Sequence, residues 1–92
     1  MTPAAGFDVF ASRFARQFDL AIVDVRPDAI LADHLEFDSF DTLLLVLWLE
    51  ESAGLAVPMF EVPELVTVAD AYTYFDGLRR RVAAERAEGP RS

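Results

Sequence analysis

The longest apolar run of the chain, Leu43 to Leu49, places the strongest constraint on its fold. Asp38 or Ser39 is a suitable helix N-cap ahead of this run, and Asp41 adds a carboxylate to the first turn. Gly54 then follows as a stop signal, so the pattern predicts one helix that ends near it. A helix that is apolar all round either lies at the centre of a bundle or contacts a partner. The run is only about a third of the length that spans a bilayer, so we expect no membrane-spanning segment.

A phenylalanine stripe near the N-terminus predicts a second amphipathic helix. Apolar residues recur there at steps of three and four, with arginine and glutamine between them. This helix should cover residues 4 to about 20. The segment from Asp24 to Asp28 holds a proline and three charges, which favours a long connecting loop before the next helix. The stripe consists of Phe7, Phe10, Ala11, Phe14 and Phe18.

The clearest helical pattern lies towards the C-terminus. Thr67 and Asp70 form a variant of the capping box, and apolar residues then follow at helical steps from Val68 to Val82. Before this helix, the segment from Pro58 to Pro63 has room for only a turn or two. The last helix is therefore expected to begin at about Thr67.

Length and pattern together predict an all-α fold. We expect a small bundle of three to four helices with a long loop between helices one and two. The 92 residues suffice for one domain with a modest core, which we place at residues 1–86. Residues 87–92 lack apolar side chains large enough to dock, so this tail should fray. The N-terminus has no basic region of the kind that opens a signal peptide, which favours a cytoplasmic location.

The charge balance limits the classes of partner. The chain carries 16 acidic and 8 basic residues, and every basic residue is an arginine. A net charge of −8 opposes binding to nucleic acid or an anionic membrane, and it favours partners with basic surfaces. Because the chain has no cysteine and a single histidine, His34, we expect no disulfide and no metal site. No group of residues forms a convincing catalytic constellation, so the chain is not expected to be an enzyme.

Ser39 is the residue most suited to carry chemistry. It lies after a loop, beside Asp38, at a helix start, where its hydroxyl should be exposed. The unpaired backbone N–H groups and the partial positive charge of a helix N-terminus favour a phosphate ester built on that hydroxyl. The alternative is that Ser39 only caps the helix, because serine and aspartate are the commonest cap residues.

The order of five short segments resembles the attachment region of acyl and peptidyl carrier proteins. In those proteins aspartate, serine and leucine open a long helix, which is followed by an acidic pair and a glycine. A β-branched residue before proline comes next, and then the last helix. The resemblance covers roughly residues 28 to 78, and the joint order of the segments is more specific than any one of them. In this chain the segments are Asp38-Ser39-Phe40, Glu50-Glu51, Gly54, Val57-Pro58 and Thr67-Val68-Ala69-Asp70-Ala71.

The resemblance implies that Ser39 carries a 4'-phosphopantetheine arm, with Asp38 as the adjacent motif residue. A phosphopantetheinyl transferase would attach the arm from coenzyme A, and cargo would then be held as a thioester. Partners would include an acyltransferase, a ketosynthase or adenylating enzymes of an assembly pathway. The absence of lysine and the altered motif favour a bacterial natural-product pathway of polyketide type over bulk fatty-acid synthesis. The alternatives are an aminoacyl or peptidyl carrier, and an unmodified carrier-like interaction module.

Several residues depart from the family pattern. Glu36 stands where a glycine usually precedes the serine, and Phe40 replaces the usual leucine. Leu44 and Phe60 stand where acidic residues are usual. The recognition surface should therefore be unusually apolar, although Trp48 has the alternative of filling the core. The expected docking surface consists of Phe40, Leu44, Leu47 and Trp48, flanked by Asp41, Glu50 and Glu51.

Overall fold

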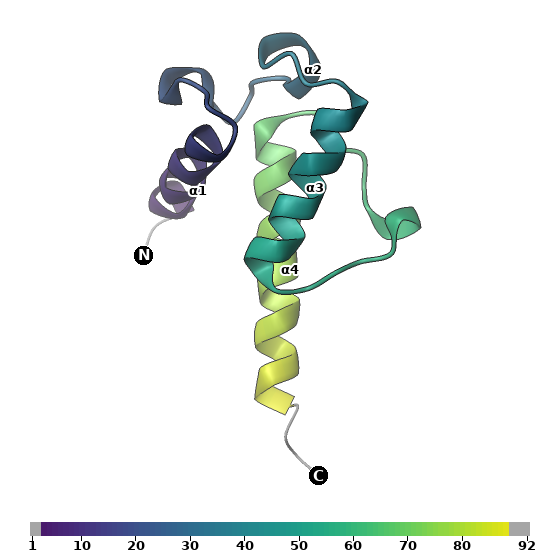
Figure 1. Cartoon of the computed structure of the whole chain (residues 1–92). Helices are drawn as coiled ribbons and strands as arrows, with labels where there is room; N and C mark the ends of the chain where they lie inside the picture. The colour runs from purple at the N-terminus through teal and green to yellow at the C-terminus, as the bar shows by residue number, and fades with distance from the viewer. Residues whose placement is uncertain (1–2, 89–92) are drawn as a thin grey trace.

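The computed structural model describes residues 3–88, and its regular structure is helical (Figure 1). Within that range the only strand-like pairing is an isolated bridge between Ile30 and Thr67, which confirms the predicted all-α fold. Helix α3 lies alongside α4, and η2 lies on the side away from α1 (Figure 1). The elements are α1 (Pro3–Gln17), η1 (Ile22–Asp24), α2 (Leu31–His34), α3 (Ser39–Ala53), η2 (Met59–Glu61) and α4 (Val68–Glu88).

The core is built from the phenylalanine stripe of α1 against α3 and α4. The ring of Phe10 lies 6.0 Å from Trp48 of α3 and 5.2 Å from Tyr72 of α4, measured between centroids. Phe14 is fully buried and meets Trp48 edge to face at 6.0 Å. Such aromatic pairs add to the free energy gained from burying their area. The three long helices are therefore joined by one aromatic cluster.

Gly6 allows α1 to approach α4 closely. A Cβ atom at this position would lie 2.7 Å from the hydroxyl oxygen of Tyr72, which is closer than real Cβ contacts. The missing side chain therefore leaves room for the Tyr72 hydroxyl, and larger residues at position 6 would push Tyr72 out of place.

Helix α3 begins and ends where the sequence predicts. Asp38 is its N-cap, and Gly54 is its C-cap in the left-handed conformation, with φ of 81°. Its buried face consists of Leu45, Val46, Leu49 and Glu50.

The loop between α1 and α3 contains more structure than the sequence indicates. Helix α1 ends at Gln17, earlier than the predicted residue 20, and two short helices follow it. The backbone N–H of Val68 donates to the carbonyl of Ala29 (3.0 Å), and that of Ala69 donates to Pro27 (2.9 Å). These bonds satisfy donors of the first turn of α4 that have no partner within their own helix. The loop is thus fastened to the start of α4.

Helix α4 extends past the predicted start of the frayed tail. It continues through Glu88, so the first two residues of the expected tail are helical. Alanine, arginine and glutamate are good helix formers, which favours this extension. The boundary of the domain at residue 86 and the fraying of the tail stay predictions. Residues 89–92 of the expected tail lie outside the described residues.

Candidate functional site

Ser39 is the first residue of α3 and is exposed to solvent. The carboxylate of Asp38 accepts a hydrogen bond from the backbone N–H of Asp41 (2.8 Å), and the Asp41 carboxylate accepts one from the N–H of Asp38 (3.1 Å). This reciprocal capping box fixes the helix start. The alternative that Ser39 itself is the cap is wrong, because Asp38 occupies that position. The Ser39 hydroxyl therefore stands at the helix N-terminus without a capping role.

The electrostatics of the helix start favour negative charge. The hydrogen bond from the backbone N–H of Asp41 lowers the pKa of Asp38 below its usual value. The same backbone donors and the helix dipole would stabilise a phosphate group attached at Ser39. Glu36 and Asp41 place further carboxylates close by in the chain, so a partner that approaches Ser39 meets an acidic surface.

Glu36 adopts a backbone conformation that favours glycine. Its φ is 60°, in the left-handed region that side chains other than glycine enter at a cost. This position is three residues before Ser39, where carrier proteins usually have a glycine. This chain adopts the left-handed conformation at that position although the residue is a glutamate.

A hollow of about 490 Å³ opens beside Ser39, between α3 and the segment that contains η2. Most of the side chains that line it are apolar. Sequence reasoning missed it, because only the tertiary fold brings residues 59–65 next to Ser39. The hollow is lined by Ser39, Thr42, Leu43, Val46, Met59, Val62, Pro63, Glu64 and Leu65.

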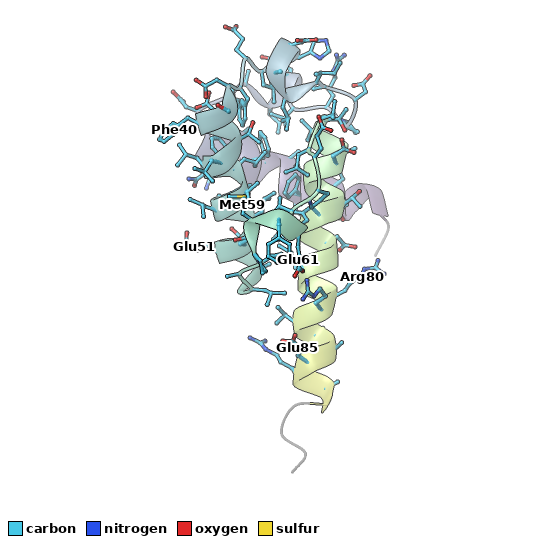
Figure 2. All side chains as sticks on the ribbon, turned by 90° about the vertical axis from the view of Figure 1, so that its right-hand side faces the viewer. Phe40, Glu51, Met59, Glu61, Arg80 and Glu85 are labelled. Carbon is cyan, nitrogen blue, oxygen red and sulfur yellow. The ribbon has the colours of Figure 1, made fainter. Side chains whose placement is uncertain are left out.

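The outward face of α3 carries exposed apolar side chains below Ser39. Phe40 is 63% exposed, Leu44 40% and Leu47 51%, and we call these three residues the outer patch. Figure 2 shows Phe40 projecting outward from the start of α3, with Met59 of η2 in front of the same helix. Phe60 of η2 is 87% exposed. Because Phe40, Leu44 and Leu47 are four and three residues apart, they form one continuous apolar stripe on α3.

Trp48 lies between the core and the surface. It is half-buried, and its ring packs against Phe10 and Phe14 of α1 and against Phe18 just after that helix, at centroid distances of 6.0, 6.0 and 5.8 Å. Most of the contacts of Trp48 are therefore with the core, as the alternative interpretation held. Trp48 does not belong to the outer patch.

Glu50 does not lie beside the outer patch, as the sequence analysis expected. It is 9% exposed and accepts a hydrogen bond from the Tyr74 hydroxyl of α4 (3.0 Å). Burial and this bond raise the pKa of Tyr74 to about 12. Glu51 is exposed and Asp41 is partly exposed, so these two carboxylates remain available at the surface. The helical rotation between Glu50 and Glu51 places them on different sides of α3.

Among residues 3–88, no group of three or more histidine, aspartate or glutamate side chains is arranged to hold a metal ion. None of the helices in this range is long and apolar enough to cross a membrane.

Comparison with known proteins gives several acyl carrier proteins. The chain is 30% identical over 76 residues to the acyl carrier protein of Campylobacter fetus subsp. fetus. The aligned region covers 83% of this chain and 99% of that protein. It is 33% identical over 64 residues to that of Campylobacter hominis, with 70% and 81% covered. The acyl carrier protein of Helicobacter pylori is 29% identical over 70 residues, with 76% and 90% covered. No family model matches the chain.

The helical bundle and these similarities define a carrier protein. More particularly, the chain belongs to the acyl carrier protein family, as the order of its sequence segments predicted. Members of this family are carriers without catalytic activity, and the prediction that the chain is not an enzyme is confirmed by this membership.

Proposed function

We propose that the chain holds biosynthetic intermediates as thioesters on a 4'-phosphopantetheine arm attached to the oxygen of Ser39. The observation that carries this proposal is an exposed serine hydroxyl at the start of α3, with capping already supplied by Asp38. A phosphopantetheinyl transferase would join the serine oxygen to the phosphorus of the arm and release adenosine 3',5'-bisphosphate from coenzyme A. The bound arm supplies the thiol that this cysteine-free chain lacks.

The residues present fit such an arm. The N–H groups at the start of α3 suit its phosphate, and the hollow beside Ser39 is apolar enough to shelter an aliphatic part of the arm or cargo. Ser39, Asp38 and the hollow would therefore bind, orient and shield the group, while partner enzymes carry out the chemistry.

Intact mass tests the attachment directly. The protein would be incubated with coenzyme A, Mg²⁺ and a broad-range phosphopantetheinyl transferase. We expect a gain of one phosphopantetheine that is absent from Ser39→Ala. Ser52→Ala is the matched control, because Ser52 is an exposed serine near the other end of the same helix and should leave the gain intact. No gain, with this enzyme or with the host's own transferases, would instead favour an unmodified interaction module.

We infer that the outer patch of Phe40, Leu44 and Leu47 is where partner enzymes dock. Its exposure next to Ser39 supports this role, and Asp41 and Glu51 add charge at its margin. Leu47→Ala should reduce the kcat/KM of transfer to a partner about tenfold, because docking loses apolar contact area. Val23→Ala is the matched control, since Val23 is an exposed apolar residue of η1, away from the outer patch. Equal transfer rates for the two variants would remove the outer patch from the docking surface.

The cargo and pathway form the finer part of the proposal. The apolar patch and the lysine-free composition support a polyketide-like bacterial natural-product pathway, with an acyltransferase and a ketosynthase as partners. Incubating the loaded protein with acyltransferases and with adenylating enzymes, followed by mass analysis of the arm, distinguishes this from an aminoacyl or peptidyl carrier. The cytoplasmic location stays a prediction.

A further inference from the structure

A groove lined by arginines crosses α1, α3 and α4, away from Ser39. It consists of three adjoining hollows of about 270, 330 and 330 Å³ that all include Ser52 of α3. We call it the arginine groove. Two of its arginines come from α1 and two from α4: they are Arg13, Arg16, Arg79 and Arg86.

The charge of the groove contrasts with that of the chain. The protein has 16 acidic residues and a net charge of −8. Even so, none of the described side chains that line the three hollows is an aspartate or a glutamate. Asp76 pairs with Arg79 at 3.0 Å but does not line the groove. Half of the chain's arginines therefore converge on one surface that contains no carboxylate.

The helix macrodipole does not account for this arrangement. Arg86 lies in the last turn of α4, where a cation is favourable. Arg79 lies more than two turns before that end, and Arg13 belongs to another helix. Both line the same hollow, so a common ligand explains their convergence better than helix stabilisation does.

That hollow also has aromatic walls. Phe10, Trp48, Tyr72 and Phe75 line it, and the guanidinium carbon of Arg79 lies 5.2 Å from the centre of the Phe75 ring. The ring contact and the pair with Asp76 hold the long arginine side chain at the hollow, and the guanidinium donors that Asp76 does not use can bind a carboxylate. The site thus combines space for an apolar side chain with cations beside it.

We propose that the arginine groove binds an acidic segment of a partner protein, with one aromatic or aliphatic side chain of that segment in the aromatic hollow. A short acidic segment fits better than nucleic acid or an anionic membrane, because the rest of this acidic chain would repel an extended polyanion. Ser52 lies about 20 Å along α3 from Ser39, on a different side of the helix. The segment would therefore hold the protein while Ser39 stays free, and the proposal does not depend on modification of Ser39.

Trp48 lines the hollow and is the only tryptophan of the chain, so its fluorescence reports occupancy. The probe is a short capped peptide of glutamates around one central phenylalanine, titrated at low and at physiological ionic strength. We expect a saturable change in Trp48 emission that weakens with salt. The double variant Arg13→Gln/Arg79→Gln should raise the Kd about tenfold. The matched control is Arg80→Gln/Arg81→Gln, which changes the net charge equally and also removes one ion pair with Asp76. Its Kd should stay within about twofold of the parent value.

Both variants change exposed side chains, and an unchanged unfolding midpoint would show that each is folded. Absence of peptide binding, or equal weakening by the two double variants, would overturn the proposal. So would equal binding of a peptide with alanine in place of phenylalanine, because the aromatic hollow would then have no role. Stronger binding to anionic lipid vesicles than to the peptide would replace the proposed partner with a membrane.

Discussion

The starts of α3 and α4 use the same local device in opposite surroundings. At α3, Asp38 and Asp41 exchange hydrogen bonds of 2.8 and 3.1 Å. At α4, Thr67 and Asp70 do the same at 3.0 and 3.1 Å. Ser39, the first helical residue after the cap Asp38, is exposed, whereas Val68, the first after Thr67, is completely buried. A capping box therefore fixes where a helix begins, and the surrounding chain decides whether that start becomes a site or an anchor of the core.

The largest effect expected from this contrast is on stability. Val68→Ala should lower the free energy of unfolding by about 2 kcal/mol, because it removes buried methyl groups from a packed core. Ser39→Ala should change it by less than about 0.5 kcal/mol, since the side chain is exposed and does not cap the helix. Urea unfolding of both variants measures the difference. Similar losses for both would mean that the two helix starts are equally structural.

A smaller effect, of opposite sign, is expected at Glu36. Glu36→Gly should raise the free energy of unfolding by about 0.5 to 1 kcal/mol, because glycine enters the left-handed conformation without steric cost. Thermal unfolding detects this change, and Glu51→Gly serves as a control that should destabilise the protein, because Glu51 lies within α3. If Glu36→Gly were also destabilising, the carboxylate at position 36 would be making a compensating contact.

The smallest expected effect is a difference in pH dependence between the two caps. Hydrogen bonds from the N–H groups of Thr67 and Val66 lower the pKa of Asp70, and the bond from the Asp41 N–H lowers that of Asp38. Because both folded pKa values lie below the unfolded value of about 3.9, each carboxylate stabilises the fold above that pH. This stability is lost as the pH falls through the folded pKa.

Unfolding of Asp70→Asn and Asp38→Asn across a pH series measures the two contributions. Both variants should be less stable than the parent at neutral pH and should approach it in acid. The loss of stability at neutral pH should be larger for Asp70→Asn than for Asp38→Asn. Asp70 is partly buried, whereas water screens the charge of exposed Asp38. If the difference in stability between variant and parent did not change with pH, the carboxylate charge would have no part in capping.

The two long helices after the loop were predictable because their signals are local. Cap residues at Asp38 and Thr67, and a stop at Gly54, mark their ends within a few residues of sequence. Helix α2 was missed because four residues are too few for a period to emerge. The exposed serine of the candidate site followed from the same local signals.

Features that depend on distant residues were not predictable in this way. Glu50 was expected at the surface with Glu51, but its partner is Tyr74, 24 residues further along the chain. The hollow beside Ser39 and the arginine groove likewise form only where separate helices meet. Residue spacing shows which residues share one face of a helix. Which element packs against that face depends on the tertiary fold.

The bonds between the loop and α4 also bear on how the protein opens. The backbone N–H groups of Val68 and Ala69 donate to carbonyls of the loop, and Leu31 of the loop donates to Val66 (2.9 Å). Because these bonds join the loop to the start of α4, neither of these two segments can detach while the other keeps its bonds. The amide hydrogens of Leu31, Val68 and Ala69 should therefore show the same free energy of opening in hydrogen–deuterium exchange, as a single cooperative unit. The segment that the sequence predicts to be a long connecting loop would then open only when the first turn of α4 unfolds.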